Sequence, residues 1–180
     1  RSTSMFDDKK VLVILSTQRS GSTMVCDDIS GTKILGTPTE YLQKFLNQKE
    51  KFTKDKFEEV TALIENKAKT TNGVVSIKVM ANQIVPFARI FSEIYDIKDT
   101  SYEKVFLGLF STAHFLRVKR MDKVSQAVSR LMARLTKSYH SAVHDGDEEL
   151  KKIWLGVEKD SYHTCFNSLT WIENYILSYK

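Results

Sequence analysis

The sequence predicts an α/β protein of three layers, in which helices cover both faces of a mainly parallel central sheet. Three short apolar runs, at residues 11–15, 74–80 and 112–118, have the composition of buried strands. Segments whose apolar residues follow helical spacing separate these runs. Strands that alternate with helices are typical of a parallel sheet, because a parallel pair needs a crossover connection.

The first strand and the first helix are predicted on either side of a loop of small residues. The strand covers residues 11–15, and the helix is expected over residues 22–29 with a turn at Gly31. Residues 34–35 are then predicted to be a short strand, which becomes a loop at residues 36–38 because of its Gly and Pro.

Two helices and a strand are predicted in the middle of the chain. Residues 42–48 are expected to form a short helix. Residues 54–69 carry apolar side chains three and four positions apart, which predicts an amphipathic helix. Asn72-Gly73 is a turn signal, and the apolar run at residues 74–80 follows it as the second strand.

The last third of the chain is predicted to add a strand between helices. A helix is expected over residues 84–95, with Pro86 in its first turn. The third strand covers residues 112–118, and Asp122 is then placed to cap another helix. Residues 168–179 also have a helical pattern. The apolar face of the helix after Asp122 comprises Val124, Ala127, Val128, Leu131, Met132 and Leu135.

Composition narrows the class of protein. A chain of 180 residues is expected to form a single domain, over residues 5–180, with residues 1–4 set aside as a cloning remnant. The net charge of +5 suits an anionic ligand, although nucleic acid or an anionic surface would suit it equally. No transmembrane segment is predicted, because no apolar run reaches roughly 18 residues. Cys26 and Cys165 form no disulfide framework, so we expect a reducing, cytoplasmic location, with Cys26 a small buried residue.

The loop after the first strand contains the residues most indicative of function. In order, these are Gln18, Arg19, Ser20, Gly21, Ser22 and Thr23. A helix N-terminus after a strand attracts phosphate-like anions, a glycine permits close approach, and an arginine adds several donors. The loop lacks the Lys and the second Gly of a Walker A sequence, which argues against a kinase or an ATPase. A simple polar turn with Ser22 as N-cap is the alternative.

A second loop is expected to face the first. Parallel strands end at one edge of the sheet, and ligands of such sheets bind beyond that edge. The segments that follow residues 11–15 and 112–118 both leave strands there. We therefore expect the two segments to approach one ligand from two sides.

Four segments carry a resemblance to a known family. Residues 16–23 read Ser-Thr-Gln-Arg-Ser-Gly-Ser-Thr, residues 36–42 read Gly-Thr-Pro-Thr-Glu-Tyr-Leu, residues 77–83 read Ile-Lys-Val-Met-Ala-Asn-Gln, and residues 120–129 read Arg-Met-Asp-Lys-Val-Ser-Gln-Ala-Val-Ser. Together they resemble the sulfotransferases that use 3′-phosphoadenosine 5′-phosphosulfate (PAPS), in particular the trehalose 2-sulfotransferase-like family. The resemblance implies a P-loop-like sulfotransferase fold and in-line transfer of a sulfuryl group to a hydroxyl of a carbohydrate or glycolipid.

The resemblance also implies roles for single residues. The loop at residues 18–23 would hold the 5′-phosphosulfate, with Arg19 countering the charge that grows on the leaving group. Arg120 and Ser129 would hold the 3′-phosphate, and Glu40 would be the general base. Without the resemblance, Glu40 is a solvated carboxylate, Arg120 pairs with a surface acid, and Ser129 has no special role in its helix.

Two further residues are expected at the acceptor. Lys78 and His140 would contact it, and His140 is the second candidate base; a structural ion pair for Lys78 and a surface position for His140 are the alternatives. No metal is expected, because the reaction needs none and the His and Cys residues lack ligand spacing.

The chain also departs from the family pattern. Met121 replaces the second Arg of the 120–129 segment, Leu42 replaces an aromatic residue, and Tyr139 precedes His140 where the family has Trp. We expect a C-terminal part or loop residues to be missing. A non-catalytic module that binds PAPS or its product is therefore the main alternative. A nucleic-acid binder is not favoured, since no basic stripe is interleaved with aromatic residues. The sequence leaves a homodimer open.

Overall fold

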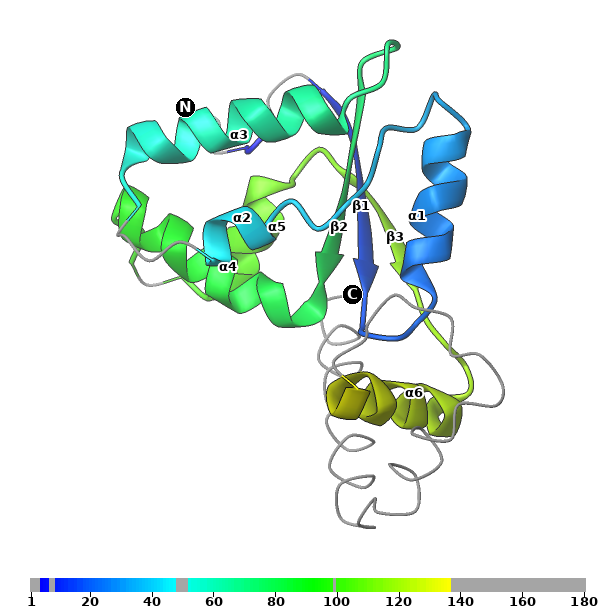
Figure 1. The fold of residues 1–180 in the computed structure, drawn as a ribbon. Helices are drawn as coiled ribbons and strands as arrows, with labels where there is room; N and C mark the ends of the chain where they lie inside the picture. The colour runs from blue at the N-terminus through cyan, green and yellow to red at the C-terminus, as the bar shows by residue number, and fades with distance from the viewer. Residues whose placement is uncertain (1–3, 7–8, 48–51, 99, 137–180) are drawn as a thin grey trace.

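Three parallel strands form the centre of the fold. The computed structural model describes residues 4–6, 9–47, 52–98 and 100–136. The strands β1 (Lys10–Ser16), β2 (Val74–Met80) and β3 (His114–Val118) lie in the order β2-β1-β3 (Figure 1). Ser16 pairs with Met80 on one side and with Val118 on the other, so the carboxyl ends of all three strands are level.

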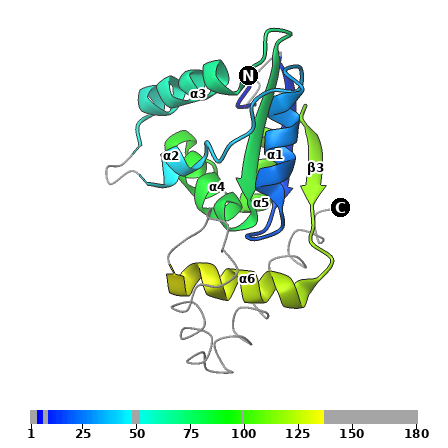
Figure 2. The same ribbon diagram turned by 45° about the vertical axis from the view of Figure 1, so that its right-hand side comes forward.

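Six helices surround the sheet within the described part of the chain. One face is covered by α1 (Ser22–Gly31). The other face is covered by α2 (Gln43–Leu46), α3 (Lys54–Ala68), α4 (Ala81–Tyr95) and α5 (Tyr102–Leu109). The last helix, α6 (Lys123–Thr136), lies beyond the carboxyl ends of the strands in both views (Figures 1 and 2). No helix of the described residues is long and apolar enough to cross a membrane.

Two cores divide the apolar side chains between the faces of the sheet. The larger contains Val13 and Ile77 together with a group of aromatic rings; Phe45 lies with its ring centroid 4.9 Å from that of Phe57. The smaller contains Ile14, packed against α1. Because neighbouring residues of a strand point to opposite faces, Val13 and Ile14 enter different cores. The three-layer α/β fold predicted from the sequence is therefore confirmed.

The predicted strand at residues 34–35 is wrong. Both residues lie in the loop after α1 and are exposed. Lys33 and Gly36, on either side of the pair, have positive φ angles of 58° and 84°. Two left-handed residues so close together turn the backbone sharply, so the pair cannot extend along the sheet.

Helix α4 begins three residues earlier than predicted, at Ala81, and Pro86 lies inside the helix rather than in its first turn. Pro86 cannot donate to the carbonyl of Asn82. Both residues are on the exposed side of α4, where water can take that hydrogen bond. The helix therefore tolerates a proline that the sequence pattern placed at its start.

The other differences concern α5 and α6. Helix α5 was not predicted, although Ser101 caps it by accepting a hydrogen bond from the N–H of Lys104. Asp122 caps α6 as predicted, since its Oδ1 accepts the N–H of Ser125 at 2.9 Å. Hydrogen bonds from Ser125 lower the pKa of Asp122. Val124 does not belong to the buried face of α6, because it is 56% exposed. The predicted helix at residues 168–179 lies outside the described residues.

Candidate active site

The loop between β1 and α1 has a backbone suited to the close approach of an anion. Arg19 and Gly21 have φ angles of 60° and 87°, and a non-glycine residue rarely adopts such an angle. Gly21 is the N-cap of α1 and has no side chain to cap the first turn. The alternative in which Ser22 is the N-cap is therefore wrong. The N–H groups of this turn have no partner inside the helix, and the helix dipole favours negative charge there.

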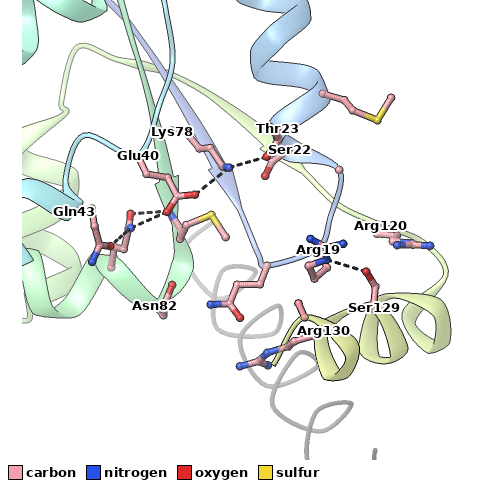
Figure 3. A pocket seen from close by; sticks show the side chains of 16 residues that line it. Arg19, Ser22, Thr23, Glu40, Gln43, Lys78, Asn82, Arg120, Ser129 and Arg130 are labelled. Carbon is pink, nitrogen blue, oxygen red and sulfur yellow. Dashed lines mark hydrogen bonds and ion pairs between the residues drawn. The ribbon is translucent and has the colours of Figure 1, made fainter. Parts of the chain in front are cut away.

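Three hydrogen bonds hold α6 against this loop. The buried side chain of Gln126 donates from Nε2 to Oγ1 of Thr17 at 2.9 Å and to the carbonyl oxygen of Gln18 at 2.7 Å. Arg19 donates from Nε to Oγ of Ser129 at 2.8 Å (Figure 3). The loop after β1 and the helix after β3 thus meet, and Ser129 has a specific partner outside its own helix.

The segment that contains Glu40 packs against strand β2. The N–H of Lys78 donates to the carbonyl oxygen of Thr39 at 2.9 Å. Three residues before Thr39, Gly36 lies so close to Ser76 that a Cβ built on Gly36 would be 2.6 Å from the Ser76 backbone nitrogen. These contacts fix the backbone on both sides of residues 37–38, in the loop that leads to Glu40. The side chain of Glu40 therefore extends from a segment that packs against β2.

A buried lysine connects Glu40 to α1. Nζ of Lys78 lies 3.1 Å from Oε1 of Glu40 and donates to Oγ1 of Thr23 at 3.3 Å (Figure 3). The Lys78 side chain is buried, whereas that of Glu40 is 39% exposed. On its other side, Glu40 accepts at Oε2 a hydrogen bond of 3.3 Å from Nε2 of Gln83. A carboxylate, an ammonium group and the first turn of α1 therefore lie in one chain of contacts.

These groups line a single cavity of about 590 Å³. Its lining residues are Gln18, Arg19, Gly21, Ser22, Thr23, Met24, Glu40, Gln43, Lys78, Met80, Asn82, Gln83, Arg120, Ser129, Arg130 and Ala133. All the predicted site residues are among them except Ser20 and His140. Ser20 is buried without a hydrogen-bond partner for its Oγ, and His140 lies outside the described residues. The cavity brings together residues from five separate elements and their loops.

Sequence reasoning missed the contribution of Arg130. On α6, Gln126, Ser129, Arg130 and Ala133 follow helical spacing, so they share the side that faces the loop after β1. This spacing was a usable signal once Ser129 had been singled out. Met121, by contrast, is 80% exposed and does not line the cavity.

The amides near Glu40 were missed as site residues for a different reason. Gln43, Asn82 and Gln83 come from α2 and α4, and only the packing of these helices brings them to Glu40. Met24 also lines the cavity from the first turn of α1. No single segment of the sequence contains a pattern that joins them.

Cys26 is the small buried residue that was predicted, and it belongs to the smaller core with Ile14. Burial raises the pKa of its thiol, and the nearby Lys78 opposes this only in part. A thiol with a raised pKa forms little of the reactive thiolate at neutral pH. The described residues contain no group of three or more His, Cys, Asp or Glu side chains that could hold a metal ion.

Comparison with known proteins identifies one family. The family model described as Stf0 sulphotransferase matches residues 11–164. The match includes the loop at residues 16–23 and the segment at residues 120–129. It also includes every described element from β1 to α6, except for Lys10, the first residue of β1. A search among curated proteins found no match to this chain.

Proposed function

Because the chain belongs to the Stf0 sulphotransferase family, we propose that it transfers the sulfuryl group of PAPS to a hydroxyl group of a carbohydrate or glycolipid. One observation carries the proposal. A single cavity contains the uncapped N-terminus of α1, three arginine side chains and the carboxylate of Glu40. An anionic donor and a base that deprotonates an alcohol would therefore meet in one place.

The cationic groups suit the donor. Arg19, Arg120 and Arg130 line the cavity together with the first turn of α1. Arginine presents a planar fork of donors that matches phosphate and sulfate oxygens. In the proposal, the loop at residues 18–23 holds the 5′-phosphosulfate, while Arg120 and Ser129 hold the 3′-phosphate. Arg130 adds a third guanidinium group, although Met121 contributes none.

Glu40 is the proposed general base. The acceptor hydroxyl gives its proton to Glu40 as its oxygen forms a bond to sulfur. The bond between sulfur and the bridging oxygen breaks at the same time, and its electron pair stays on the 5′-phosphate of the departing nucleotide. Such a transfer depends mainly on alignment and on stabilisation of the charge that develops.

Lys78 is proposed to balance charge during this step. Its ammonium group lies between Glu40 and Thr23, so it touches both the base and the turn that would hold the leaving phosphate. When Glu40 takes the proton, its negative charge disappears while negative charge grows on the phosphate. A buried ammonium between the two sites stabilises both the initial and the final charge distribution.

The residues around Glu40 suit an acceptor rich in hydroxyl groups. Gln43 and Asn82 line the cavity, and their amide groups both donate and accept hydrogen bonds. Figure 3 shows both residues on the same side of the cavity as Glu40, away from Arg120. Uncharged amides favour the hydroxyls of a sugar over a second anion. This arrangement supports a carbohydrate as the acceptor, either alone or as the sugar of a glycolipid.

Ligand-dependent melting and a transfer assay test the proposal. Adenosine 3′,5′-bisphosphate (PAP) is expected to raise the Tm more than AMP does at equal concentration, because only PAP has the 3′-phosphate. Loss of such a charge-assisted contact costs about 1.5–3 kcal/mol, or roughly 10- to 100-fold in affinity. Radiolabelled PAPS is then incubated with a panel of sugars and glycolipids. Equal shifts with PAP and AMP would contradict the donor assignment. A protein that binds PAP but sulfates nothing is a binding module instead.

The role of Arg130 is tested by a matched pair of variants on α6. Arg130→Met is expected to weaken PAP binding by about 10-fold or more, since it removes a guanidinium group from the cavity. Arg134→Met removes an exposed arginine one turn further along, outside the cavity lining, and serves as the control. Isothermal titration with PAP measures both. An equal loss of affinity in the two variants would show that only the overall positive charge matters.

A further inference from the structure

We infer that Gln83 is the positioning residue of the base: it orients Glu40 so that Oε2 is the oxygen that takes the acceptor proton. The inference rests on the proposed function and names a residue and an atom for the same site. Gln83 comes from the first turn of α4 and is 2% exposed. It lines the cavity, but so little of it is exposed that it acts through Glu40.

The main chain of α4 determines which end of the Gln83 amide faces Glu40. Gln83 is the third residue of α4, and its Oε1 accepts the N–H of Met80, the N-cap residue, at 3.1 Å. A side chain that reaches back in this way satisfies an otherwise unpaired donor at the helix start. With its oxygen so engaged, Gln83 can present only its NH₂ group to Glu40. Turning the amide over would lose this bond and bring two acceptor oxygens together.

Both hydrogens of that NH₂ group have partners. Nε2 donates to Oε2 of Glu40 at 3.3 Å and to Oε1 of Gln43 at 2.9 Å. Both polar atoms of the Gln83 side chain are thus engaged, with Met80, Glu40 and Gln43 as partners. Glu40 is 39% exposed on a loop and would otherwise sample several rotamers. Contacts from Gln83 and Lys78 hold its carboxylate from two sides.

The two oxygens of Glu40 have different neighbours, which decides where the proton goes. Oε1 lies 3.1 Å from the ammonium group of Lys78, and Oε2 faces the uncharged amide of Gln83. A proton on Oε1 would stand beside a positive charge in a partly buried site, which is unfavourable. Oε2 has a second lone pair, and it is there that the acceptor O–H is deprotonated as its oxygen bonds to sulfur. The S–O electron pair leaves with the 5′-phosphate.

Gln83→Glu separates positioning from a structural role. A glutamate at the third helix position accepts the Met80 N–H as well as glutamine does, and the helix N-terminus tolerates its charge. It cannot donate to Glu40, however, and it places a like charge beside that carboxylate. We expect kcat to fall by about 10- to 100-fold, with the PAPS KM and the PAP Kd within about twofold of the unaltered protein. Gln83→Met removes the cap as well, and should lower both kcat and Tm.

Controls distinguish this inference from the proposed function. Ser92 lies on the same helix, and its hydroxyl is buried without a hydrogen-bond partner among the described residues. Ser92→Ala should therefore leave kcat unchanged. In a Glu40→Gln background, Gln83→Glu should have little further effect on kcat, because Gln83 acts through Glu40. Retained kcat in Gln83→Glu, or a full additional loss in the double variant, overturns the inference alone. If the unaltered protein transfers no sulfuryl group from PAPS to any acceptor, the proposed function fails and the inference fails with it.

Discussion

Glu40→Gln is expected to lower kcat for sulfuryl transfer by about 10²- to 10⁴-fold, the range typical of a lost general base. The amide has nearly the same shape as the carboxylate but cannot take the acceptor proton at neutral pH. Its oxygen can still accept a hydrogen bond from Lys78, which lies 3.1 Å from Oε1 in the unaltered protein. The loop at residues 18–23 and α6, which are proposed to hold the nucleotide, are untouched, so PAP affinity should change by no more than about threefold. Steady-state rates with labelled PAPS and calorimetric titration with PAP measure the two quantities.

A matched control separates the base from the ion pair. Glu59→Gln breaks a pair of similar length, 3.0 Å to Nζ of Lys56, on the exposed surface of α3 and away from the cavity. An exposed pair of this kind contributes little to stability. We expect Glu59→Gln to have the kcat of the unaltered protein. If Glu40→Gln also kept its kcat, another residue would have to accept the proton, and Glu40 would be left with a binding role.

Gly36→Ala is expected to destabilise the protein by about 2–5 kcal/mol, a combination of backbone strain and overpacking. Gly36 has a φ of 84°, and an added Cβ would lie 2.5 Å from Oγ and 2.6 Å from the backbone nitrogen of Ser76. The side chain of Ser76 can turn away, but the backbone of a central part of β2 cannot. The segment would have to lift from the strand, which would also move Glu40 away from Lys78. Chemical denaturation should show lower stability, and the folded variant should have lower kcat.

Gly73→Ala provides the comparison for this change. Gly73 has a nearly identical φ of 82°, and its added Cβ would meet no heavy atom within 4 Å. Its cost is therefore the strain alone, about 1–2 kcal/mol. The difference between the two variants measures the contact with Ser76. Equal stabilities would mean that the segment containing Glu40 can shift away from β2 at little cost. The contact between Gly36 and Ser76 would then not hold Glu40 in place.

The strands and the loop after β1 could be predicted from the sequence because their signals are local. An apolar run identifies β1, and the following Arg19, Gly21 and Ser22 are adjacent in the chain. The parallel direction of the strands then follows from their alternation with helices, whereas the order β2-β1-β3 is known only from the structure. The placement of Ser129 beside Arg19 required only that two strands end at the same edge.

Other features could not be predicted because they depend on packing between distant segments. The contact between Gln83 and Glu40 exists only because α2, α4 and β2 meet at one corner of the sheet. The apolar pair at residues 34–35 resembled a strand, but the backbone angles around it exclude one. Helix α5 is short, and its cap at Ser101 was a local signal that was overlooked.

The bond between Arg19 and Ser129 joins residues 110 positions apart, and this separation has a consequence for folding. Contacts so distant in sequence form only after the chain between them has become ordered, because closing a long loop costs entropy that local contacts do not repay. Helices such as α3, whose contacts are local, are therefore expected to form before the proposed nucleotide site. A nucleotide bound in the cavity would stabilise contacts that form last in folding, and it would slow unfolding. Protection from proteolysis by PAP would therefore report that the whole sheet has assembled with α6.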